Sequence, residues 1–154
     1  MRDFDDTAKG KKSARIELPI NPDKLSEERL SELEAEIKTC LKSGYLPCPA
    51  AWKIARKAGV TKIAVGEVCD RLGIRVTDCQ IGFFKKVKTP YDDAGQENMS
   101  DEADHALREL SRDNRLTCAS IFELAKRYKT KPITVSRQAG ALGLKIRECQ
   151  LGCF

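Results

Sequence analysis

The sequence is poor in the residues and motifs that mark many enzymes and membrane proteins. It has one histidine, one tryptophan and only 6% aromatic residues among 154. It contains no GxSxG, HExxH or CxxC motif, and Gly10-Lys11-Lys12-Ser13 lacks the first glycine of a phosphate-binding loop because Asp5 stands there. No apolar stretch approaches the ~18 residues of a membrane span, and the N-terminus lacks the apolar region of a signal peptide. We therefore predict a cytoplasmic protein that is not an enzyme, with no membrane partner, cofactor or identifiable small-molecule ligand.

The composition is that of a folded protein with a small excess of positive charge. Hydrophobic residues make up 41% and charged residues 33% of the chain, and the net charge is +5. A mildly basic chain is compatible with a polyanionic partner without requiring one. The seven cysteines are expected to be mostly free thiols, because disulfides rarely persist in the cytoplasm.

The chain contains an internal duplication. Residues 46–84 align with residues 116–154 at an offset of 70 without a gap, and 11 of the 39 aligned pairs are identical. The matches include the endings CQIGFF and CQLGCF, so that Cys79, Gln80 and Gly82 correspond to Cys149, Gln150 and Gly152. Two copies are too few for a solenoid and indicate a duplicated module.

Helix start and stop signals extend the duplication upstream. Ser26 is a predicted N-cap, followed by Glu27 and Glu28, and an apolar stripe then leads to Gly44 as the stop signal. The second copy repeats this order with Ser100 as the cap and Asn114 as the stop. We therefore expect a first helix at the start of each copy.

Two more helices and one short strand are expected in each copy. Proline or small residues open the second helix, Thr61 and Thr130 are candidate caps of the third, and Gly73 and Gly143 end it. Alternating β-branched residues then indicate a strand. The expected helices cover about 49–58, 61–72, 119–128 and 130–142, and the strands 74–79 and 144–149.

These signals predict a mainly α protein with two tandem three-helix modules. We place a flexible N-terminal segment at 1–24, module 1 at 25–84, a linker at 85–99 and module 2 at 100–154. A single strand per module leaves backbone groups unpaired. Three arrangements are open: antiparallel pairing between the copies about a pseudo-two-fold axis, pairing with Ile16–Ile20, or a two-stranded wing.

The second and third helices carry the motif with functional content. Ala55 is followed four residues later by Gly59, and Ile63, Val65 and Val68 are apolar. This pattern resembles the helix-turn-helix superfamily of DNA-binding proteins. The second copy keeps Ala125, Ile133 and Val135 but departs at three positions, where it has Lys129, Thr130 and Gln138. The endings CQIGFF and CQLGCF resemble those of short prokaryotic helix-turn-helix proteins of uncharacterised function.

The resemblance implies binding of duplex DNA and a role as a transcriptional regulator. In such proteins the N-terminal residues of the third helix face base edges in the major groove. The corresponding positions here are Thr61, Lys62, Ala64, Lys131, Thr134, Ser136, Arg137 and Gln138. The second set is richer in hydrogen-bond donors, since Arg137 can contact guanine and Gln138 adenine. The net charge is +3 over residues 46–84 and +5 over residues 116–154, which favours phosphate contact.

Two other functions remain open at this point. A helix-turn-helix fold also serves as a protein-interaction module, in which case a protein partner or a homodimer replaces DNA. Cys79, Cys149 and Cys153 are candidates for a metal or redox site if their strands meet. The usual paired CxxC spacing is missing, so burial as small apolar residues is the simpler interpretation, and no metal is assigned. Trp52 and Phe122 occupy one aligned site and are predicted core aromatics.

Overall fold

A computed structural model describes residues 18–83, 99–113 and 115–153. Within these ranges the chain is mainly helical, as predicted, with a two-stranded parallel sheet. It divides into two units: unit 1 comprises residues 1–79 with 150–154, and unit 2 comprises residues 80–149. Residues 1–17 of the predicted flexible segment, and all of the predicted linker except Met99, lie outside the described residues.

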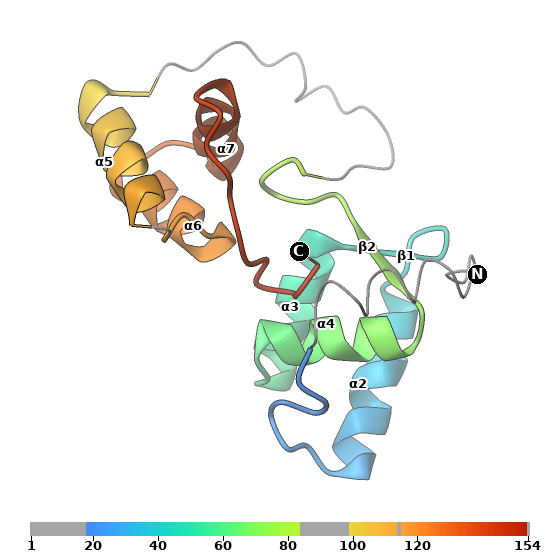
Figure 1. Ribbon diagram of the computed structural model, residues 1–154. Helices are drawn as coiled ribbons and strands as arrows, with labels where there is room; N and C mark the ends of the chain where they lie inside the picture. The colour runs from blue at the N-terminus through green and yellow to red at the C-terminus, as the bar shows by residue number, and fades with distance from the viewer. Residues whose placement is uncertain (1–17, 84–98, 114, 154) are drawn as a thin grey trace. The chain divides into compact units, whose positions relative to one another are not determined.

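The described residues of unit 1 form three helices, and two of them start at the predicted caps. Ser26 caps the first by accepting a hydrogen bond from the backbone N–H of Arg29, and Thr61 caps the third by accepting one from Ala64. The first helix ends at Thr39, before Gly44, which lies in a separate turn with φ of 81°. The elements in chain order are α2 (Glu27–Thr39), β1 (Tyr45–Pro47), α3 (Cys48–Ala58), α4 (Lys62–Arg71) and β2 (Arg75–Thr77) (Figure 1).

Unit 2 contains the helices α5 (Asp101–Arg112), α6 (Cys118–Arg127) and α7 (Pro132–Ala141). Ser100 caps α5 as predicted. Thr117 and Ser120 form a capping box at α6: Oγ1 of Thr117 accepts from the backbone N–H of Ser120, and Oγ of Ser120 accepts from the backbone N–H of Thr117. The N-cap of α7 is Lys131 rather than the expected Thr130, and it makes no side-chain cap bond. Pro132 at the first position supplies the helical φ instead.

The turn before the third helix has the same backbone conformation in both units. Gly59 has φ of 66° and the aligned Lys129 has φ of 51°, so both are left-handed. Behind each turn a backbone N–H reaches back to the second helix: Val60 donates to the carbonyl of Ala55 and Thr130 to that of Ala125, at 3.0 and 2.9 Å. Lys129 therefore keeps the turn geometry without glycine, at a strain that L-residues normally avoid.

The strands pair within each unit, not between the copies. β1 pairs parallel with β2, with Leu46 opposite Val76, and the second copy has the aligned parallel bridge between Thr117 and Arg147. The expected antiparallel pairing about a pseudo-two-fold axis is therefore wrong. The partner is the short segment just before the second helix, and the helix pair supplies the crossover that parallel strands need.

Each unit has its own apolar core, built from all of its helices. Ile37 on α2 and the aligned Leu107 on α5 are both 0% exposed. The fully buried large side chains of unit 1 include Leu33, Ile37, Leu46, Val65, Val68 and Leu151, and those of unit 2 include Leu107, Leu116, Ile121 and Val135. None of the described helices is long and apolar enough to cross a membrane.

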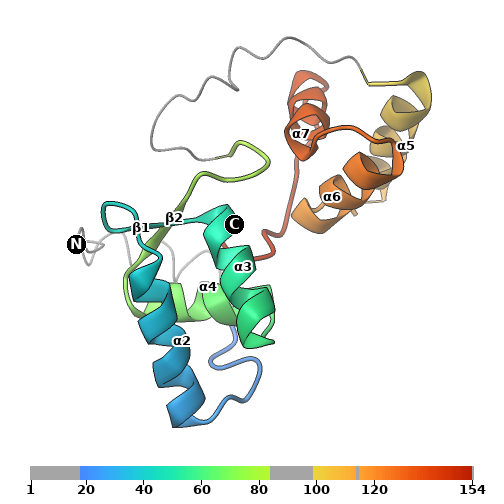
Figure 2. The same ribbon diagram turned by 180° about the vertical axis from the view of Figure 1, so that it is seen from behind.

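The two CQxGxF endings are exchanged between the units. Residues 150–154 belong to unit 1, although they end the second copy, and Gln80–Phe83 belong to unit 2, although they end the first. We call these segments tail 2 and tail 1. Each follows an aligned left-handed residue, Glu148 (φ 53°) or Asp78 (φ 52°). In Figures 1 and 2 the dark red C-terminal segment reaches the region of α3 and α4. The predicted module boundaries at 84 and 154 kept each tail with its own copy.

Candidate nucleic-acid interface

The N-cap and the second turn of α7 present two exposed cations among the predicted contact residues. Lys131 and Arg137 are exposed, while Thr134 and Ser136 are half-buried. The backbone N–H of Thr134 donates to the carbonyl of Lys131 at 2.9 Å, which closes the first turn. Lys131 therefore extends from the start of α7, and Arg137 from the following turn.

Gln138 is held by α5. Its Nε2 donates to Oδ1 of Asp104 at 2.7 Å, and Nε of Arg108 donates to Oδ2 of the same carboxylate at 2.8 Å. These two bonds, that of Arg108 above all, hold the pKa of Asp104 below its ordinary value. The Gln138 amide thus ties α7 to α5, whereas the sequence suggested that it reads adenine.

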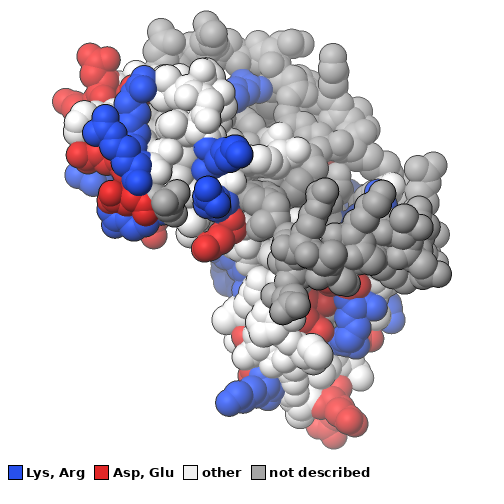
Figure 3. All heavy atoms as spheres, in the orientation of Figure 1, with Lys and Arg blue, Asp and Glu red and all other residues white. Residues whose placement is uncertain are grey.

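Basic residues surround α7 without any acidic residue between them in the chain. Residues 124–147 contain seven Lys or Arg and no Asp or Glu, and all seven side chains are exposed. Figure 3 shows that on the visible face of unit 2 basic side chains stand beside acidic ones. The acidic ones come from outside this run, and four are on α5: Asp101, Glu102, Asp104 and Glu109. The seven basic residues are Lys126, Arg127, Lys129, Lys131, Arg137, Lys145 and Arg147.

The predicted contact residues of the first copy are committed to contacts inside unit 1. Thr61 donates from both its backbone N–H and its Oγ1 to the carboxylate of Asp23, at 2.6 and 2.5 Å. Lys62 places its Nζ 3.5 Å from the centroid of the Trp52 ring and donates to Oε1 of Gln150 at 2.5 Å. Ala64 is 2% exposed. The structure therefore separates the two predicted sets: the first faces protein, and the second includes exposed cations.

Some cations of unit 1 form ion pairs with acidic neighbours. Lys57 pairs with Glu36 at 2.7 Å, and this hydrogen bond raises the pKa of Lys57. Arg71 pairs with Glu34 at 2.8 Å and with the buried Glu67 at 3.4 Å. Lys126, Lys129, Lys145 and Arg147 of unit 2 form no ion pair within the part of the chain that the structure describes, and the same holds for the exposed Lys24, Lys42, Lys53 and Arg56 of unit 1. The units differ in that the basic run of unit 2 contains no acidic residue.

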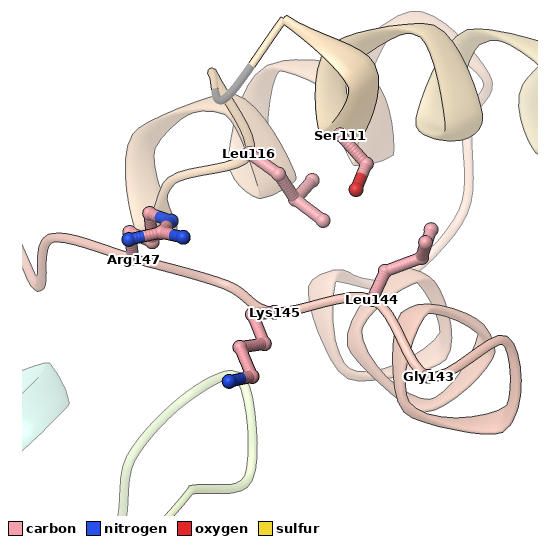
Figure 4. A pocket seen from close by; sticks show the side chains of 6 residues that line it. All are labelled: Ser111, Leu116, Gly143, Leu144, Lys145 and Arg147. Carbon is pink, nitrogen blue, oxygen red and sulfur yellow. The ribbon is translucent and has the colours of Figure 1, made fainter.

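Unit 2 has an open hollow of about 510 Å³ between α5 and the end of α6, lined by residues that include His105, Arg127 and Tyr128, and a smaller cavity between the end of α5 and the residues after α7. The volume of the smaller cavity is about 230 Å³, and the side chains of Leu116 and Leu144 point toward one another within it, while that of Lys145 points away (Figure 4). This is below the ~300–1,000 Å³ of typical ligand pockets. The cavity lining includes no group of converging polar side chains, and we assign it no ligand.

The cysteines are free thiols, as predicted, and most are buried. Cys48, Cys69, Cys79 and Cys118 are buried, and Cys149 and Cys153 are half-buried. Cys149 belongs to unit 2 and Cys153 to unit 1. Among the described residues no group of three His, Cys, Asp or Glu side chains is placed to hold a metal ion.

Sequence reasoning missed the contacts that tail 2 makes on α4. The repeats Gln80/Gln150 and Gly82/Gly152 were visible, but nothing in them indicates which helix a tail contacts. Trp52, expected in the core, is half-buried beneath Lys62. Comparison of the chain with protein families, with curated proteins and with solved structures finds no match.

Proposed function

We propose that this protein binds duplex DNA through unit 2, with α7 at the major groove. One observation carries the proposal: seven exposed cations and no acidic residue over residues 124–147, centred on a helix that follows a tight turn. Two short helices joined by such a turn are the arrangement that helix-turn-helix proteins use to present a recognition helix. Gene regulation is the role that such binding would serve.

The side chains of unit 2 divide into phosphate contacts and base contacts. Lys126, Arg127 and Lys129 flank the turn and are assigned to phosphates, where cations act without regard to sequence. Arg137, exposed on α7, is assigned to a base edge, because a guanidinium can donate two hydrogen bonds to guanine. Lys131, Thr134 and Ser136 complete the proposed surface.

In this proposal unit 1 makes no contact with DNA bases. Thr61 is hydrogen-bonded to Asp23, and Lys62 contacts Gln150 and Trp52. Ala64 is buried in the core. These hydrogen bonds must break, and the buried Ala64 must become exposed, before α4 can enter a groove. We therefore assign α4 no DNA contact.

A protein-interaction module is the second candidate, and one observation favours it. The aligned helix α4 already accepts a peptide segment, tail 2, along its surface. The aligned helix pair of unit 2 can bind a peptide segment in the same way. This candidate predicts a stable protein partner and no salt-dependent binding of DNA.

The two candidates are separated by binding to random-sequence duplex DNA over a salt series. If unit 2 neutralises phosphates, log affinity falls linearly with log salt, with a slope of about −0.9 for each phosphate contacted. Lys126→Ala should make that slope shallower by about 1. The matched control is Arg56→Ala, which removes the aligned exposed cation of unit 1 and should leave the slope unchanged.

Arg137→Ala tests the base contact. It should reduce affinity for a selected preferred site by about 1–3 kcal/mol, with a much smaller effect on random duplexes. Absence of salt-dependent binding by the unaltered protein would overturn the proposal. An equal loss in Arg56→Ala and Lys126→Ala would overturn its assignment to unit 2.

A further inference from the structure

The contact between tail 2 and α4 has the features of a fitted binding site. A Cβ at Gly66 would meet the backbone carbonyl of Leu151, so this close approach of tail to helix depends on glycine. Leu151 is 1% exposed and forms part of the unit 1 core. The α4 side of the contact thus has a glycine that admits the tail backbone and a pocket that buries one leucine.

Polar groups fix the position of tail 2 along α4. Nζ of Lys62 donates to Oε1 of Gln150 at 2.5 Å, and the same ammonium lies over the Trp52 ring. Gly152 is left-handed with φ of 71°, and a Cβ there would meet the side chains of Leu18 and Ile63. The α4 surface therefore distinguishes the order Gln-Leu-Gly: an amide at the first position, a buried aliphatic at the second and no side chain at the third.

The corresponding contact in unit 2 uses aligned residues but differs in detail. A Cβ at Gly82 of tail 1 would lie 2.5 Å from Cδ1 of Ile133, the counterpart of Ile63. Ser136 and Pro132 stand where α4 has Gly66 and Lys62. The backbone therefore cannot approach α7 as it approaches α4, and the ammonium that binds the tail amide is missing at that position.

None of the contacts that hold tail 2 depends on the peptide link to the preceding residues. The chain enters the tail through Glu148, whose left-handed backbone lies just before the point where it leaves unit 2. A short element that packs away from its own copy can be supplied equally well by another molecule, which is the basis of segment exchange between identical chains.

We propose that the α4 face, formed by Trp52, Lys62, Ile63 and Gly66, is a docking site for a Gln-Leu-Gly segment that a second copy of this chain supplies. In a single chain the tail competes at an effective concentration of about millimolar. Exchange between unaltered chains is therefore expected only at comparable protein concentrations. Removing the intramolecular contact should expose the intermolecular one.

Two full-length variants make the test by complementation. Leu151→Asp places a charge in the core position of the tail and leaves the α4 face intact, whereas Gly66→Leu obstructs the face and leaves the tail intact. Each variant alone should have the 17.2 kDa mass of a single chain by light scattering after size exclusion under reducing conditions. An equimolar mixture should give a 1:1 complex of twice that mass.

The matched control mixes Leu151→Asp with the double variant Gly66→Leu/Leu151→Asp, which has no competent tail. This mixture should remain at the single-chain mass. A mixture of the two single variants that stays at 17.2 kDa, with both variants folded by circular dichroism, would overturn the proposal.

A peptide experiment decides the question if either variant folds poorly. The peptide of residues 148–154 is titrated into the Leu151→Asp protein, and Trp52, the single tryptophan, reports docking through its fluorescence. We expect a saturable change, or recovery of folding. Replacing Gln150 by Ala in the peptide should weaken binding about tenfold, because it removes a hydrogen bond to a charged donor. No change with either peptide would overturn the proposal. DNA binding by unit 2 is measured separately, so either proposal can fail alone.

Discussion

Helices α4 and α7 are aligned in sequence, follow the same left-handed turn and start beside the same apolar residue, Ile63 or Ile133, yet they present opposite surfaces. α4 is buried along most of its length and covered by tail 2, and its buried carboxylate Glu67 pairs with Arg71. α7 exposes Arg137 at the position aligned with Glu67. The same backbone arrangement therefore yields one third helix that is mostly buried and another with an exposed arginine at the aligned position.

A few aligned positions account for the difference. Gly66 admits the tail backbone where Ser136 carries a side chain, and Lys62 binds the tail amide where Pro132 cannot. The comparison teaches that the pattern shared by the two copies specifies the backbone of the helix pair but not what the third helix of each unit faces. That depends on residues outside the pattern, including ones about 80 positions away in the chain.

The largest expected effects come from the aligned core anchors of the two units. Ile37→Ala and Leu107→Ala each remove a side chain that is 0% exposed, and each should lower the free energy of unfolding by about 2–5 kcal/mol. Urea unfolding followed by Trp52 fluorescence reports unit 1, and circular dichroism reports both. Because tail 2 ends the second copy, we expect Leu107→Ala to shift the Trp52 transition as well. An unshifted Trp52 transition in Leu107→Ala would show that the units unfold independently.

Glycines inside the two third helices should respond in opposite directions. Gly66→Ala brings a Cβ against the Leu151 carbonyl and should destabilise by about 1–3 kcal/mol. Gly140→Ala meets nothing within 4 Å and should stabilise by about 0.5–1 kcal/mol, because alanine is the better helix former. Thermal or urea unfolding of both variants measures the contrast. Equal effects of one sign would mean that tail 2 does not constrain α4.

Exchanging the aligned turn residues Gly59 and Lys129 should change the stability of the two units in opposite directions. Lys129→Gly relieves a left-handed lysine (φ 51°) and should stabilise by roughly 0.5–1 kcal/mol, whereas Gly59→Lys should destabilise by a similar amount. Nothing lies within 4 Å of a Cβ built at Gly59, so backbone strain alone is tested. Matching changes in urea midpoint of opposite sign would support identical turns, and a destabilised Lys129→Gly would contradict them.

The smallest effect concerns the bond between α5 and α7. Hydrogen bonds from Arg108 and Gln138 lower the pKa of Asp104 from its ordinary value of 3.8. The ionised carboxylate therefore stabilises the fold fully at pH values above 3.8. That contribution is lost as the pH falls through the lowered pKa. Asp104→Asn should therefore reduce stability at pH 7 by less than about 0.5 kcal/mol, since the group is solvent-screened. Urea unfolding from pH 7 to 2.5 should show the difference shrinking in acid, and a pH-independent difference would refute the charge-based explanation.

Local signals in the sequence predicted the helices well. Ser26, Thr61 and Ser100 cap their helices as expected because capping needs only a side-chain oxygen and the next turn. The strand partner was missed, since Tyr45–Pro47 is three residues long and contains proline, which gives no alternating pattern. The N-cap of α7 is one residue later than expected, at Lys131, because Pro132 favours the first helical position.

The candidate site was predictable only in part. The excess of cations in the second copy is a property of the sequence itself. The exchange of the tails was not predictable, because both endings carry the same Cys-Gln-x-Gly pattern and neither encodes a destination. The hydrogen bond from Gln138 to Asp104 was not predictable from the sequence either, because 34 residues separate the partners and no local periodicity connects them.

The exchange of the endings also sets the order in which the molecule can be completed during synthesis. Helix α4 leaves the ribosome long before residues 150–152, which follow it by about 80 positions. At 5–20 residues per second the delay is about 4–16 seconds. Unit 1 therefore stays unfinished until residues 150–152 are translated, and a chain terminated before them would leave α4 uncovered.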